Sequence, residues 1–174
     1  MSKLRVKEIA HSNGTQAMTV DANGYIHTPA RPAFMVRNTS SDAMTDTGWR
    51  TVNLAGTKYT DVGNNVHADG YFICPVDGIY HFDCRMRVDG IGSSYVIMCL
   101  SDLITGSSPA TGASTQLYGS TYHIDGSPPS NYITMMCSIT IELDANTNVM
   151  PWLYSADTSI TVNTVSSFSG FLVG

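Results

Sequence analysis

The segment from Gly70 to Val88 constrains the fold of this chain more than any other part of the sequence. A short apolar run is followed by a turn at 75–78, and a second run then continues to Val88. From Tyr80 onward apolar and polar residues alternate, as in a strand with one buried and one solvated face. The apolar positions are Tyr80, Phe82, Cys84, Met86 and Val88, and the polar positions are His81, Asp83, Arg85 and Arg87. Such a strand needs a second apolar layer to cover it.

Short apolar runs bounded by Gly, Pro, Asn, Asp or Ser fill the rest of the chain. No window sustains the spacing of three and four residues that an amphipathic helix needs, so we expect an all-β fold. Strands are predicted at 49–54, 57–60, 64–67, 70–74, 78–88, 93–101, 114–118, 131–143, 148–154, 159–163 and 166–173.

The run Tyr95–Leu100 is apolar on both of its faces, unlike 131–143, which alternates. In a small two-layer sandwich, one face of a strand ordinarily meets water. A strand with two apolar faces therefore predicts that another subunit covers the second face.

The composition bounds the partners of the chain. Its 174 residues suffice for one domain and a short appendage. A net charge of −5, a pI near 5.3 and a charged fraction of 13% disfavour nucleic-acid binding, which needs a concentrated basic face. No apolar run approaches the length of a membrane span, and the first residues lack the apolar core of a secretory signal. We therefore expect synthesis in a cytosol and no membrane insertion.

The four cysteines are widely spaced within apolar strand patterns. We expect reduced core thiols and no disulfide framework. They form no Cys-x-x-Cys or Cys-x-x-His pair, so a zinc site is not predicted. We expect no metal and no other cofactor.

Residues 1–31 differ from the rest of the chain. Four basic and two acidic residues give this segment a net charge of +2, which leaves −7 for 32–174. Two short strands with hairpin-type turns are predicted, with too few large apolar residues for a core. We expect the segment to become ordered against another chain. The candidate attachment residues are Leu4, Val6, Ile9, Met18 and Val20. A solvent-exposed N-terminal end with no attachment role explains the positive charge of this segment equally well.

Three blocks of the main part resemble the globular C1q domain family of the C1q/TNF-like superfamily. The first is the opening strand Pro32-Ala33-Phe34. The second contains Gly70, Phe72, Pro75, Val76, Gly78, Tyr80 and Phe82 at the spacing of the family. The third is the final Phe168-Ser169-Gly170-Phe171-Leu172. Asp77 and the Asn146-Thr147 turn depart from the family pattern, so its calcium-associated position is not secured here.

The resemblance implies a ten-stranded antiparallel jelly-roll sandwich over 32–174 that assembles as a homotrimer. The candidate interface residues are Tyr95, Ile97, Cys99 and Phe171. The collagen stalk of the family is absent from 1–31. This segment resembles the short trimeric lead-in segments of bacteriophage fibre and virion proteins.

No motif indicates catalysis, and we do not expect an enzyme. Gly-x-Ser-x-Gly, His-Glu-x-x-His and phosphate-binding glycine loops are all missing from the sequence. The pairs at His67/Asp69, His81/Asp83 and Glu142/Asp144 are explained by solvated strand positions. Trp49 and Trp152 are candidate sugar platforms, but a core or interface role is the commoner one in strands. A glycan hydrolase would need a carboxylate pair in a cleft between subunits.

The long neutral stretch 105–130 predicts a functional or covering loop. Within it Tyr118, Tyr122 and His123 are candidate ligand contacts, because aromatic rings supply flat apolar surface at low entropic cost. The favoured hypothesis is a trimeric phage head or tail fibre, or a capsid-decorating knob. It would be located in the virion, attach to other virion proteins through 1–31, and contact a host surface glycan or protein. The alternative is a cellular C1q-like soluble module that binds carbohydrate or protein.

Overall fold

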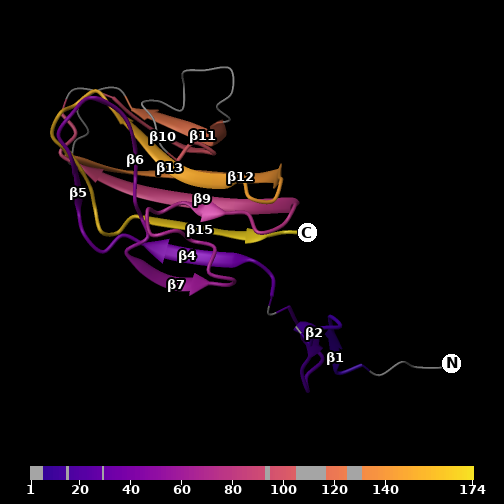
Figure 1. The fold of residues 1–174 in the computed structure, drawn as a ribbon. Coiled ribbons are helices and arrows are strands. Elements are labelled where there is room, and N and C mark those ends of the chain that lie inside the picture. The colour runs from indigo at the N-terminus through magenta and orange to yellow at the C-terminus, as the bar shows by residue number, and fades with distance from the viewer. Residues whose placement is uncertain (1–5, 15, 29, 93–94, 105–116, 125–130) are drawn as a thin grey trace.

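The computed structural model describes residues 6–14, 16–28, 30–92, 95–104 and 131–174, and the backbone of a strand at 117–124. Every regular element in these ranges is a β-strand, so the all-β prediction is confirmed. The strands form two large sheets that face each other, and a small N-terminal sheet that stands apart from them (Figure 1).

The larger sheet is organised around one long central strand. Its members are β5 (Asp42–Met44), β14 (Ile160–Val162), β9 (Gly78–Asp89), β15 (Ser167–Leu172), β4 (Ala33–Arg37), β7 (Thr57–Asp61) and β12 (Tyr132–Leu143). One edge of β9 pairs with β12 along its whole length. The other edge pairs with β15 and then with β14. The predicted strands at 78–88 and 131–143 are thus the two longest strands of this sheet, and they pair with each other along their whole length.

The opposing sheet supplies the second layer. Its strands are β11 (Leu117–Ile124), β10 (Val96–Ser101), β13 (Asn148–Ser155), β6 (Gly48–Thr51) and β8 (Phe72–Ile73). The order is β11-β10-β13-β6, and β8 also pairs with β13. Because several strands of the two large sheets are short, the described residues contain more separate strands than the ten that the resemblance implies. At the predicted strand 64–67, only Val66 makes a bridge, to Phe72.

The alternation seen in the sequence of β9 becomes the core. Its five apolar side chains are at most 1% exposed. Phe34 of β4 lies among other rings, with centroids 4.5 Å from Phe72 and 4.8 Å from Phe168. From the opposing sheet, Met98 and Leu153 are fully buried. The two layers therefore enclose one continuous apolar interior.

The turn before β9 is tied to a second turn of the chain. Asp77, which departs from the family pattern, accepts a hydrogen bond from the backbone N of Ala145 at 2.7 Å. The hydroxyl of Tyr80 donates to the carbonyl of Val76 at 2.7 Å, which closes the turn onto the strand. Asn146, in the second turn, has a φ of 67°. These bonds fix where β9 begins.

The N-terminal sheet contains β1 (Glu8–Ala10), β2 (Gln16–Val20) and β3 (Ile26–His27) in that order. The two predicted strands are present, and β3 adds a third. None of the three pairs with a strand of the large sheets. The boundary between residues 31 and 32 remains a prediction.

Substitution of Gly170 tests the packing between β15 and its neighbours. A Cβ at this position would lie 2.5 Å from Phe82 Cδ1, 2.8 Å from Phe34 Cε1 and 2.9 Å from the carbonyl oxygen of His81. We expect Gly170→Ala to lower the free energy of unfolding by about 1–3 kcal/mol, because the core is overpacked. Ser169→Ala, on the other face of the strand, should change it by less than about 0.5 kcal/mol. Urea unfolding of both variants provides the measurement, and equal midpoints would contradict the packing described here.

Candidate functional site

The outer face of the larger sheet carries the polar residues that alternate with the core of β9. His81 lies in register between Thr140 of β12 and Phe171 of β15. Its Nδ1 is 2.8 Å from Thr140 Oγ1, and its Nε2 is 2.9 Å from Asp83 Oδ2. The imidazole is thus held by two strands at the middle of an open sheet face.

Several large apolar side chains are exposed on the same face, and three of them lie on different strands. They are Met35 of β4 at 45%, Phe171 of β15 at 46% and Met136 of β12 at 67%. The Phe171 ring centroid is 5.3 Å from that of His81. Sequence reasoning singled out Phe171 but missed both methionines. Alternation could have found them, since each lies between two buried neighbours.

The second apolar face of β10 is covered by the chain itself. Cys99 is fully buried against Met150 and Trp152 of β13. Trp152 Nε1 donates a hydrogen bond to the carbonyl of Leu103 at 2.7 Å, which brings the segment after β10 over this cluster. The partly buried side chains that complete it are Trp49, Tyr71, Leu103 and Ile104. Cys99 is therefore buried without a second subunit, and the inference from two apolar faces to association does not apply to it.

The other two predicted interface residues of this segment are half-buried. The Tyr95 ring stacks on Tyr154 of β13, with centroids 5.2 Å apart, and Ile97 pairs with Tyr154 in the ladder. Ile97 belongs to the smaller sheet and Tyr95 directly precedes its strand β10, whereas Phe171 belongs to the larger sheet. The structure therefore does not place the predicted interface residues on one surface.

All four cysteines are buried, and none is in a disulfide, as expected. Burial raises the pKa of the thiols of Cys74 and Cys99 to about 12. It also raises the pKa of Cys84 well above its ordinary value. Since the thiolate is the reactive form, these residues are inert in the folded chain.

Tyr118, Tyr122 and His123 lie on strand β11. Only Tyr118 belongs to a predicted strand, 114–118, and the rest of β11 was expected to be part of a long loop. Gly119 and Ser120 concealed the strand, because both residues are depleted in strands and common in turns. Their cross-strand partners on β10 are Leu100, Met98 and Ile97, in that order. The parts of 105–130 that flank β11 lie outside the described residues. The prediction of ligand contact stays untested.

One face of the N-terminal sheet collects apolar side chains from all three strands. Ile9 pairs with Met18, and Val20 pairs with Ile26, so these four residues share a face. Ile9 is 51% exposed and Ile26 is 63% exposed. Sequence reasoning missed Ile26, because β3 is only two residues long.

A shallow hollow of about 130 Å³ lies along the first two strands. It is lined by Val6, Lys7, Glu8, Ile9, Met18 and Val20. Four of the five predicted attachment residues thus meet here, and the fifth, Leu4, lies outside the described residues. The hollow is a place where another chain can add apolar contacts.

The turn between β2 and β3 is built around Asp21. Its Oδ1 accepts hydrogen bonds from the backbone N of Tyr25 at 2.8 Å and of Asn23 at 2.9 Å. These bonds, the Tyr25 bond foremost, lower the pKa of the Asp21 carboxyl below its ordinary value. The turn presents the Tyr25 side chain to solvent, where it is 68% exposed.

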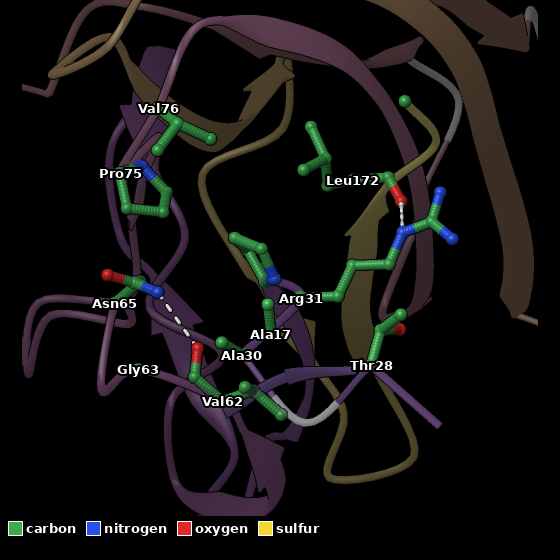
Figure 2. Close-up of a pocket in the computed structure, with 12 residues that line it drawn as sticks. Ala17, Thr28, Ala30, Arg31, Val62, Gly63, Asn65, Pro75, Val76 and Leu172 are labelled. Atoms are coloured by element: carbon green, nitrogen blue, oxygen red, sulfur yellow. Dashed lines mark hydrogen bonds between the residues drawn. The ribbon is translucent and has the colours of Figure 1, made fainter. Parts of the chain in front are cut away.

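An open groove of about 670 Å³ lies where the N-terminal segment meets the end of the sandwich (Figure 2). One wall comes from the N-terminal segment and the junction, namely Ala17, Thr28, Ala30, Arg31 and Pro32. The other comes from the end of the sandwich, namely Val62, Gly63, Asn65, Pro75, Val76, Leu172 and Gly174. Sequence reasoning missed this groove, which we call the junction groove, because separate segments build it from mostly small apolar side chains.

Arg31 joins the two walls of the junction groove. Its Nε donates to the carbonyl oxygen of Leu172 at 2.6 Å, as Figure 2 shows, and its Nη2 donates to that of Val173. The backbone N of Val173 in turn donates to the carbonyl of Ile79 at 2.6 Å. The N-terminal segment is thus fastened to the last strand, and a cation is left at the rim of the groove.

The His/Asp pairs noted in the sequence do form. His81 and Asp83 are 2.9 Å apart, and His67 and Asp69 are 3.3 Å apart. Within the described ranges, no group of three or more His, Cys, Asp or Glu side chains is placed to hold a metal ion. Trp152 is fully buried and belongs to the core, and Trp49 is half-buried. The described residues also include no helix of the length and hydropathy that crossing a membrane requires.

Comparison with known proteins shows a likeness of fold. No family profile and no curated protein sequence matches the chain. Among solved structures, the Eiger TNF protein from S. frugiperda matches 83% of this chain and 94% of its own, with a TM-score of 0.55 and 9% identity. The globular domain of zebrafish complement 1qA matches 83% and 98%, with a TM-score of 0.49 and 17% identity. The chain therefore has the C1q/TNF-like jelly-roll fold that its sequence implied.

Proposed function

We propose that this protein is a non-enzymatic virion component of a phage, a trimeric head or tail fibre or a capsid-decorating knob. The observation that carries the proposal is a complete jelly roll joined to a small sheet whose apolar face is uncovered. Its strands of three, five and two residues bury little apolar area among themselves, so a covering partner would stabilise the sheet. It is therefore suited to attach to another chain, while the jelly roll is presented outward. The protein would be made in the host cytoplasm and reside in the virion.

Three copies associate through the outer face of the larger sheet, around Phe171. Burying one large apolar side chain contributes about 1.5–3 kcal/mol, and Met35 and Met136 extend the same face. In a ring of three copies each subunit meets its neighbours with two different surfaces. Tyr95 and Ile97, half-buried on the opposite sheet, belong to the second of these surfaces in our proposal.

A charge at position 171 tests this association. We expect Phe171→Glu to sediment as a folded monomer, because three carboxylates would be buried without partners. Phe171→Leu keeps an apolar side chain and should remain trimeric. Sedimentation velocity gives the mass, and circular dichroism verifies the fold. A trimer of Phe171→Glu at micromolar concentration would show that the interface lies elsewhere.

The jelly roll contacts the host surface through β11, at Tyr118, Tyr122 and His123. This strand ends the ladder of the smaller sheet, and aromatic residues in it are suited by their chemistry to contact a glycan or protein.

Paired substitution of the two tyrosines tests host contact. Tyr118→Ala with Tyr122→Ala should weaken binding of the trimer to host cells at least tenfold, since aromatic anchors dominate such contacts. Tyr59→Ala, an exposed tyrosine of β7, is the matched control and should bind like the unmodified protein. Labelled protein on intact cells gives the affinities. Equal binding by both variants would remove β11 from the proposal.

Attachment through the N-terminal sheet has its own test. Deleting residues 1–31 should leave a trimer that no longer enters particles. Within the full chain, Ile9→Asp should reduce incorporation strongly, because it charges the apolar face. Thr19→Ser, which lies on the opposite face of the sheet and does not line the hollow, should not. Purified particles are assayed by quantitative mass spectrometry. Incorporation of the deleted chain at the normal level would exclude this mode of attachment.

The second candidate is a cellular C1q-like module that binds carbohydrate or protein. The fold shared with a TNF protein is consistent with this candidate. Finding the protein in purified virions would decide for the first candidate. Finding it only in uninfected cells or their medium would decide for the second.

A further inference from the structure

The exposed Tyr25 and the junction groove are chemically complementary, but Tyr25 does not lie in the groove of its own chain. Tyr25 is 68% exposed and is not among the residues that line the groove. The groove has a volume of about 670 Å³ and is lined mostly by apolar atoms of small side chains. A partly apolar aromatic ring and an open apolar pocket are the usual two halves of an interface anchor.

Both halves are held in place before any contact forms. Two hydrogen bonds to Asp21 hold the backbone that presents Tyr25, at 2.8 and 2.9 Å. On the groove side, Arg31 is fixed by the carbonyl oxygens of Leu172 and Val173. Because the backbone on both sides is already held, the entropic cost of contact is mainly the lost rotamer freedom of the Tyr25 side chain.

We propose that Tyr25 of each copy inserts into the junction groove of the next copy around the trimer axis. The inference rests on the homotrimer of the proposed function. A contact between two different surfaces closes into a ring when the rotation fits, and here each copy supplies one Tyr25 and one groove.

Charge and tethering favour a second copy as the occupant. Residues 1–31 carry +2 and the rest of the chain carries −7, so the arm of one copy is attracted to the jelly roll of another. Arg31 at the rim can face the inserted ring, which adds a cation–π contact. Once the jelly rolls associate, each arm stays at a high effective concentration beside its neighbour's groove. Insertion would also cover Val76, which is 45% exposed in the single chain.

Engineered thiols in the full chain test this placement. The double variant Tyr25→Cys/Val76→Cys is purified, oxidised mildly and run on a non-reducing gel. The native thiols do not compete, since all four are buried. We expect covalent trimers, because each copy is linked to the next and the ring closes. Tyr25→Cys/Tyr132→Cys is the matched control. Tyr132 pairs with Asp89 at the opposite end of β9, so this variant should remain as single chains.

The outcomes separate this inference from the proposed function. A trimer by sedimentation that gives only single-chain bands after oxidation overturns the insertion of Tyr25 and leaves the trimer standing. Single chains by both methods overturn both. As a second measurement, Tyr25→Ala should raise the concentration at which the trimer dissociates at least tenfold, and Tyr25→Phe should restore it. An unchanged dissociation of Tyr25→Ala would likewise contradict the insertion.

Discussion

The pairing of β9 along both of its edges is the constraint on which the rest of the structure depends. On one edge twelve residues pair with β12, and on the other edge β15 and β14 fix the same register. A slip by one residue would turn Asp83 and Arg85 into the core and expose Phe82 and Cys84. Burying an unpaired charge costs far more than one such contact provides, so a single register survives.

The same register positions the surfaces that we assign to function. It places Phe171 beside His81 on the open face of the larger sheet. It also brings the end of β15 to the start of β9, where Arg31 fastens the N-terminal segment. The junction groove follows from that attachment, because it lies between the N-terminal segment and the end of the sandwich. Among the described strands, none in the two large sheets pairs with the N-terminal sheet.

Much of the fold could be predicted from the sequence, because alternation within a long strand is a local property. The strands around Phe82 and Cys137 and the buried thiols were predicted in this way. What covers a residue is a tertiary property, so the burial of Cys99 by Met150 and Trp152 could not be predicted. For the same reason only the start of β11 was predicted as a strand and the rest as a loop, since pairing with β10 outweighs the turn preference of its residues. The junction groove has no local signal at all, because distant segments meet there.

The central claim is that the protein is a homotrimer in which neighbouring copies cover the apolar surfaces that a single chain exposes. The mass of the unmodified protein tests this claim most directly. Native mass spectrometry of the full chain at neutral pH measures that mass without a label or a substitution. We predict a dominant species of three times the 18.7 kDa chain mass. A dominant species of 18.7 kDa at micromolar concentration would contradict this account.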